Sequence, residues 1–122
     1  MVNLPLKGLR VIDLSRVFAM PYAAAFLADL GAEVIKVEGC AFLSADTRLG
    51  GPFGGPWADD APGELHYERN GVFHVLNRGK RSLTLDLNQA AGLETLKKLI
   101  ATADIVIENF TPRVMRKFGL DY

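Results

Sequence analysis

The sequence predicts an α/β protein in which an open parallel sheet carries helices on both of its faces. Two observations lead to this fold class. Short apolar strand patterns alternate with helix patterns along most of the chain, and two strands joined by a helix form a right-handed unit whose strands run parallel. A chain of 122 residues that is 49% hydrophobic also has enough apolar material for one core.

The beginning of the chain supplies one such unit. Residues 9–15 (LRVIDLS) form a short β-branched run that predicts a buried strand. In the helix pattern that follows, Pro21 suits the first turn, an alanine run favours helix, and Gly31 can end the helix in a left-handed conformation. This helix is apolar nearly all round, which predicts packing on more than one side. Residues 33–38 (EVIKVE) give the second strand.

Residues 39–80 interrupt this alternation. The stretch GGPFGGPWADDAPGE is rich in glycine and proline and cannot continue a helix or a central strand. The segment is too long for an ordinary connection, so we expect a long loop excursion that packs over another part of the molecule. Within it, YERNGVFHVLN could form a short helical or irregular return to the sheet.

The third strand pattern is SLTLDL at residues 82–87. Asn88 follows it and can cap a helix over residues 89–102, because asparagine is favoured at the position before a helix. Lys97 and Lys98 then lie near the negative end of that helix, where cations are favourable.

The last predicted unit is a strand over residues 104–109 followed by a short helix. Thr111 is the expected cap of this helix, Pro112 its first residue and Gly119 its end. Four strands make a thin sheet, and parallel sheets need cover on both faces. We therefore expect residues 1–122 to be the first part of a larger protein.

Composition excludes several classes of function. The formal net charge of +0 argues against a bulk nucleic-acid binder, which needs a basic excess. No apolar run approaches the ~20 residues of a membrane span, and the N-terminus lacks the pattern of a signal peptide. The single cysteine, Cys40, cannot form an internal disulfide and suits a reducing compartment. We therefore expect a cytoplasmic protein without nucleic-acid or membrane partners.

Motifs for common cofactors and nucleophiles are also missing. No G-x-G-x-x-G or Walker loop follows the first strand, and no G-x-S-x-G is present. His66 and His74 lack the surroundings of a metal site, so no metal is expected. The neighbouring Asp59 and Asp60 are expected to point apart on their loop. From these residues alone the chain is an α/β domain able to hold an anion, with no evident catalyst.

A cluster of cations precedes the third strand and allows two interpretations. Arg78, Lys80 and Arg81 could contact a polyanionic ligand, since a local site needs no overall charge. They lie, however, at the amino end of the strand, whereas ligands of open α/β sheets bind beyond the carboxyl ends. The alternative is a structural role, for example pairing with acidic residues of a partner subunit.

Three ordered blocks of sequence are similar to a known family. The blocks are LKGLRVIDLSRVFAMPYAAAFLADLGAEVIKVE, NRGKRSLTLDL and ADIVIENFTPRVMRKFGLDY. They resemble the amino-terminal part of the class III CoA-transferases, the family of formyl-CoA and carnitine CoA-transferases, whose superfamily includes α-methylacyl-CoA racemase. The resemblance covers nearly the whole chain except residues 49–76. It implies a Rossmann-like fold that is a partial domain of a larger, interlocked homodimer.

The resemblance also implies a coenzyme A site. In the family, CoA lies against the loop after the first strand, the end of the third strand, the ENF turn and a basic residue further on. The residues at these positions are Val17, Phe18, Ala19, Thr84, Leu85, Asp86, Leu87, Asn88, Asn109, Phe110, Thr111 and Lys117. Many members carry an arginine near the adenine and 3′-phosphate where this chain has Gly39.

The implied activity is the transfer of CoA from a CoA thioester to a carboxylic acid through an aspartyl intermediate. A carboxylate is a weak nucleophile that must be positioned and supported. No aspartate of this chain matches the family's nucleophile, which is expected beyond Tyr122, so the chain alone is expected to be inactive. Two alternatives remain: a racemase-type member, disfavoured by the long 49–76 segment, and a non-catalytic partner subunit or fragment.

Overall fold

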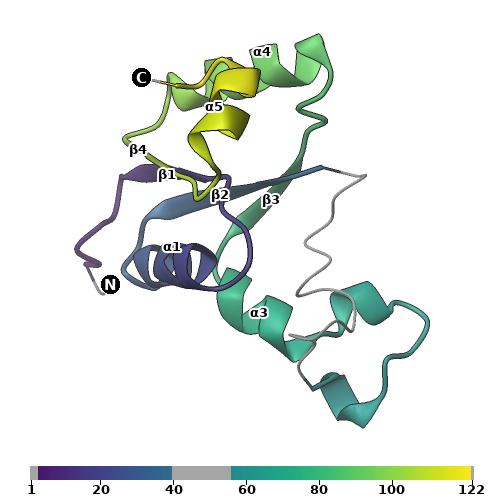
Figure 1. Ribbon diagram of the computed structural model, residues 1–122. Coiled ribbons are helices and arrows are strands. Elements are labelled where there is room, and N and C mark those ends of the chain that lie inside the picture. Colours follow the sequence, from purple (N-terminus) through teal and green to yellow (C-terminus); the bar gives the residue numbers. More distant parts are fainter. Residues whose placement is uncertain (1–2, 40–55, 122) are drawn as a thin grey trace.

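The computed structural model describes residues 3–39 and 56–121, and its strands form one four-stranded parallel sheet (Figure 1). The strand order is β3-β2-β1-β4. The strands are β1 (Arg10–Asp13), β2 (Glu33–Glu38), β3 (Arg81–Thr84) and β4 (Ile105–Ile107). β1 pairs in parallel with both β2 and β4, and β2 pairs in parallel with β3. The predicted parallel α/β fold is confirmed.

Helices cover both faces of this sheet (Figure 1). One face carries α1 and α3 and the other carries α4 and α5; their bounds are Ala19–Asp29, Gly71–Asn77, Ala90–Ile100 and Pro112–Phe118. Successive side chains of β1 point to opposite faces of the sheet. Val11 packs in a cluster with Ala24 of α1 on one face, and Ile12 packs in a cluster with Leu96 of α4 on the other. No helix in the described ranges is long and apolar enough to cross a membrane.

The segment between β2 and β3 contains α3, which lies within the stretch YERNGVFHVLN where a short helical or irregular return was expected. Asn70 caps α3 by accepting hydrogen bonds from the backbone N–H groups of Val72 and Phe73, at 2.9 and 3.3 Å. α3 thus provides the crossover between the two strands. Short 3₁₀ turns precede it at Ala58–Asp60 and His66–Glu68. Cys40 lies outside the described residues.

Several element ends differ from the sequence prediction. β1 ends at Asp13 and β3 at Thr84, so the chain leaves the sheet before residues 15 and 87. α4 begins at Ala90 with Gln89 at its cap, instead of being capped by Asn88. The reason is local: Asn88 donates its backbone N–H and its side-chain amide to Asp86 Oδ1, at 3.0 and 3.3 Å. The side chain is therefore turned away from the helix.

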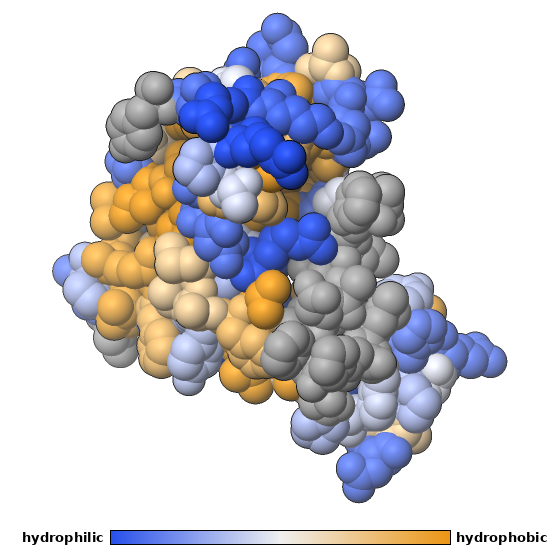
Figure 2. All heavy atoms as spheres, in the orientation of Figure 1, coloured by the Kyte–Doolittle hydropathy of each residue, from blue (hydrophilic) through white to orange (hydrophobic). Residues whose placement is uncertain are grey.

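Apolar side chains remain exposed on the outer face of α1. Its buried residues lie on one side, whereas Tyr22 and Phe26 are 42% and 48% exposed. The guanidinium carbon of Arg78 stands 5.4 and 5.1 Å from the centres of these two rings. Figure 2 shows hydrophobic residues gathered on the side of the molecule that carries α1. Packing of this helix on more than one side is therefore only partly realised.

The cations at the start of β3 and just before it bind acids of this same chain. Lys80 is fully enclosed, with its side chain 2% exposed, whereas Arg81 lies at the surface. The ion pairs are Arg78–Asp29, Lys80–Asp13 and Arg81–Glu33, with nitrogen–oxygen distances of 2.6, 2.7 and 2.6 Å. The structural interpretation of this cluster is therefore correct, but the acids are internal and need no partner subunit.

Candidate functional site

A cavity of about 490 Å³ opens at the carboxyl edge of the sheet. It lies beside β1, where the strand order reverses, since the chain builds outward from β1 to β2 and β3 and then returns to place β4 on the other side. Open α/β sheets bind their ligands at such a position. We call this the edge cavity.

Half of the predicted coenzyme-binding residues line the edge cavity. They come from the β3–α4 loop, the β4–α5 turn and α5, which are far apart in the sequence. These residues are Leu85, Asp86, Leu87, Asn88, Phe110 and Lys117. The fold thus brings together segments that the sequence prediction placed at one edge.

The lining combines an apolar wall with positive charge. The rings of Phe110 and Phe118 meet edge to face, with 6.3 Å between their centres. Lys117 lies at the exposed rim, and its Nζ is 3.3 Å from Asn88 Oδ1, so it links α5 to the β3–α4 loop. Arg16, in the loop after β1, and the buried Lys36 are further cations of the lining, which also includes the acids Glu38 and Asp86. This combination suits an elongated ligand with anionic and apolar parts.

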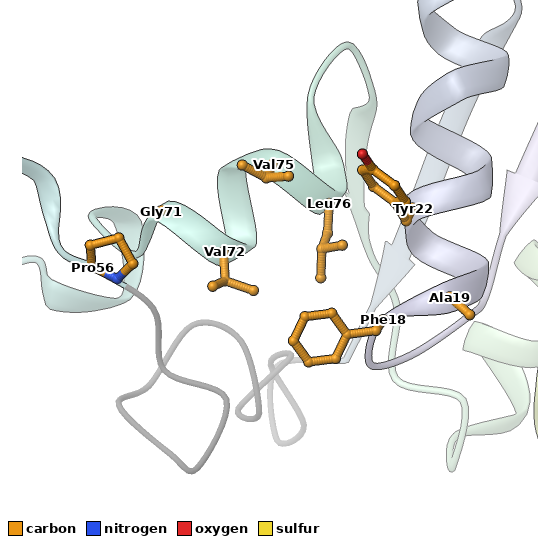
Figure 3. Close-up of a pocket in the computed structure, with 8 residues that line it drawn as sticks. All are labelled: Phe18, Ala19, Tyr22, Pro56, Gly71, Val72, Val75 and Leu76. Atoms are coloured by element: carbon orange, nitrogen blue, oxygen red, sulfur yellow. The ribbon is translucent and has the colours of Figure 1, made fainter.

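The other predicted residues lie outside this lining. Phe18 and Ala19 line a second, apolar cavity of about 460 Å³ between α1 and α3, where Phe18 faces Val72 and Leu76 (Figure 3). Thr84 is the last residue of β3, and Thr111 is the residue before α5. Val17 and Asn109 belong to the hydrogen-bonded loop described next.

The loop after β1 is held by side chains from β1, β2 and the turn after β4. Asp13 Oδ1 accepts hydrogen bonds from the backbone N–H of Ser15, at 2.9 Å, and from its hydroxyl. Lys36 Nζ donates to the Ser15 carbonyl at 2.8 Å. Asn109 Oδ1 accepts from the Arg16 N–H, and Asn109 Nδ2 donates to the Arg16 carbonyl, both at 2.9 Å. The backbone at one side of the edge cavity is therefore fixed in place.

Buried charge lies under this loop. Asp13 has no exposed side-chain surface, and the side chains of Lys80 and Lys36 are 2% and 5% exposed. Burial lowers the pKa of Lys80, and the neighbouring Asp13 carboxylate partly offsets this effect. Lys80 also donates to the carbonyl of Pro21 at 2.8 Å and to Asn77 Oδ1 at 3.1 Å. This one ammonium thus joins β1, α1 and α3 beneath the cavity.

Sequence reasoning missed several residues of the lining. Val114 and Phe118 stand four positions apart on α5, with Lys117 on the same side, so the spacing of this helix carried a usable signal. Lys36 and Glu38 also line the cavity although both are buried. Charged residues in an otherwise apolar strand, as in EVIKVE, were the available indication.

The chain is similar to known CoA-transferases and to a solved structure. The chain is 47% identical to a succinate–glutarate CoA-transferase of Agrobacterium fabrum and 41% identical to a succinyl-CoA:mesaconate CoA-transferase of Haloarcula hispanica. These alignments cover 97% and 96% of this chain but only 28% and 27% of the relatives. A crystal structure of a CAIB/BAIF family protein from Brucella suis superposes with a TM-score of 0.79 at 43% identity, over 99% of this chain and 30% of that one.

The chain thus spans less than a third of the length of these relatives. The model of the family described as CoA-transferase family III matches residues 6–122, which include every strand and helix of the fold and the whole lining of the edge cavity. The chain therefore belongs to CoA-transferase family III.

Proposed function

We propose that this chain forms the coenzyme A-binding part of an enzyme that moves CoA from a CoA thioester to a carboxylic acid. The observation that carries the proposal is the edge cavity, in which Leu85 to Asn88, Phe110 and Lys117 meet at the carboxyl edge of the sheet. The names of the relatives indicate the substrate class: succinyl-CoA as CoA donor and a small dicarboxylic acid as acceptor.

Each part of the ligand has a matching part of the cavity. Lys117 and Arg16 supply positive charge for the phosphates, because charge-assisted hydrogen bonds to phosphate are the strong ones. Phe110 offers an apolar surface to the pantetheine linker. The β3–α4 loop, which begins at Leu85, lies against the adenosine part. The family resemblance makes the same assignment for these residues, Arg16 excepted.

The chemical step is assigned to an aspartate outside this chain. Its carboxylate would attack the thioester carbonyl and release the CoA thiolate, leaving a mixed anhydride; the thiolate would then attack to give an aspartyl-CoA thioester and release the first acid. The second acid takes CoA by the reverse steps. This chain's own residues hold the CoA during the exchange, and we propose that the intact protein is a cytoplasmic homodimer.

Substitution of Lys117 tests the proposal. Loss of one charge-assisted hydrogen bond to phosphate costs roughly 1.5–3 kcal/mol, so Lys117→Ala should weaken CoA binding by the intact protein about tenfold or more. The effect should shrink for dephospho-CoA if the 3′-phosphate is the partner. Calorimetry with CoA and with dephospho-CoA measures the two affinities.

Lys98→Ala is the matched control, since Lys98 is an exposed lysine of α4 whose one ion pair in the described part of the chain is with Glu94, at 3.9 Å. It should leave CoA affinity unchanged. Equal affinity of Lys117→Ala and the parent would remove Lys117 from the site. Absence of CoA binding by the parent protein would overturn the proposed function itself.

A further inference from the structure

Val17 has a backbone conformation that L-residues with branched side chains avoid. Its φ is +65°, in the left-handed region, and it is one of three non-glycine residues with positive φ in the described part of the chain. For a β-branched residue this conformation is an outlier that persists only when the surroundings enforce it. The conformation sits between Arg16, which lines the edge cavity, and Phe18, which lines the cavity between α1 and α3.

The neighbouring hydrogen bonds show what enforces it. The side-chain amide of Asn109 meets the backbone of Arg16 as another peptide group would, accepting from its N–H and donating to its carbonyl at 2.9 Å each. Asn109 comes from the turn after β4, 93 residues away in the sequence. On the other side, Ser15 is held by Asp13 and Lys36. Asn109 thus holds the residue that directly precedes the strained Val17.

We propose that Asn109 is a positioning residue that clamps the Arg16 backbone and thereby holds Val17 in the left-handed conformation. Through this clamp it sets the direction of the chain at the edge cavity, with Arg16 on the cavity side and Phe18 turned toward α3 (Figure 3). The inference rests on the proposed function, because it assigns Asn109 an indirect part in CoA binding. Direct contact of its side-chain amide with CoA is the competing explanation.

The strain gives a rescue test that separates these explanations. When the clamp is removed by Asn109→Ala, Val17 should leave the left-handed region, since that region is unfavourable for it by about tenfold in conformational equilibrium. Glycine adopts positive φ as readily as negative φ. Adding Val17→Gly to Asn109→Ala should therefore let the loop return to its original course without the clamp.

The experiment uses the intact protein and two measurements. Calorimetry gives CoA affinity, and hydrogen–deuterium exchange of the peptide around residues 14–20 reports the loop without any ligand. We expect Asn109→Ala to weaken CoA binding about tenfold and to speed exchange of the Arg16 amide, which loses its acceptor. The double variant should regain several-fold of the lost affinity. Asn3→Ala, at an exposed asparagine remote from the cavity, should change neither quantity.

Other outcomes overturn the proposal. A double variant that binds CoA as weakly as Asn109→Ala would favour direct contact of Asn109 with the ligand. Unchanged exchange around Arg16 in Asn109→Ala would show that Asn109 does not hold the loop. If the parent protein fails to bind CoA, the proposed function is wrong. Hydrogen–deuterium exchange of the parent and of Asn109→Ala still decides in that case whether Asn109 holds the loop.

Discussion

Replacement of Lys80 by methionine tests whether the buried ion pair with Asp13 stabilises the fold. Lys80 Nζ lies 2.7 Å from Asp13 Oδ2, and neither side chain is more than 2% exposed. Methionine keeps most of the apolar stem but removes the charge. Breaking a buried pair by removing one partner typically costs about 3–5 kcal/mol, because an uncompensated charge is left behind.

The expected loss of stability for Lys80→Met lies at the lower end of the range of about 3–5 kcal/mol. Asp13 would keep Lys36 at 3.9 Å and its hydrogen bonds from Ser15, so its charge would still be partly compensated. Asp13→Asn should cost more, because it leaves two buried ammonium groups without their shared carboxylate. We expect a loss of about 3 kcal/mol for Lys80→Met and about 5 kcal/mol for Asp13→Asn.

Urea unfolding followed by circular dichroism measures these losses, with an unchanged m-value as the check on comparability. The double variant should lose less than the sum of the single losses by about 0.5–3 kcal/mol, since the two groups are in direct contact. Arg81→Met is the control from the same stretch: its pair with Glu33 is at the surface, with the Arg81 side chain 74% exposed, and should matter far less. Equal losses for Lys80→Met and Arg81→Met would refute the reasoning.

Two further results are expected. Gly92→Ala should cost about 1–3 kcal/mol in the same assay, since a Cβ there would stand 2.1 Å from the Asp86 carbonyl oxygen. Gly39→Arg should strengthen CoA binding about tenfold by calorimetry, because an added Cβ meets, among the described residues, only the Leu85 carbonyl, at 3.6 Å, and the new cation borders the edge cavity.

The sequence predicted the fold well because local patterns and topology agree. β-branched runs, an alanine-rich helix and the spacing of strands and helices were enough to give a parallel sheet with covered faces. Gly31 and Gly119 also have the positive φ expected where helices end. The prediction that Asn88 caps α4 was wrong because its side chain forms other hydrogen bonds. It donates to Asp86 and accepts from Lys117.

The site was only partly predictable for a related reason. Strand ends identify which segments meet at an edge, and the family resemblance supplied Leu85 and Phe110 within those segments. Side-chain direction depends on contacts between distant segments. Nothing near Asn109 in the sequence shows that its amide binds the backbone of Arg16, and nothing in LSRVFA shows the reversal at Val17 that turns Phe18 to the other cavity.

Pairing with acids distinguishes the cations of this chain, whose formal net charge is +0. At the amino end of β3, Lys80 and Arg81 are neutralised by Asp13 and Glu33. Their charge stabilises the contacts of α1 and β2 with the sheet and is no longer available to a ligand. At the carboxyl edge, Lys117 meets only a neutral amide oxygen within the described part of the chain. Lys117 therefore differs from Lys80 and Arg81 in lining the edge cavity without an acidic partner among the described residues.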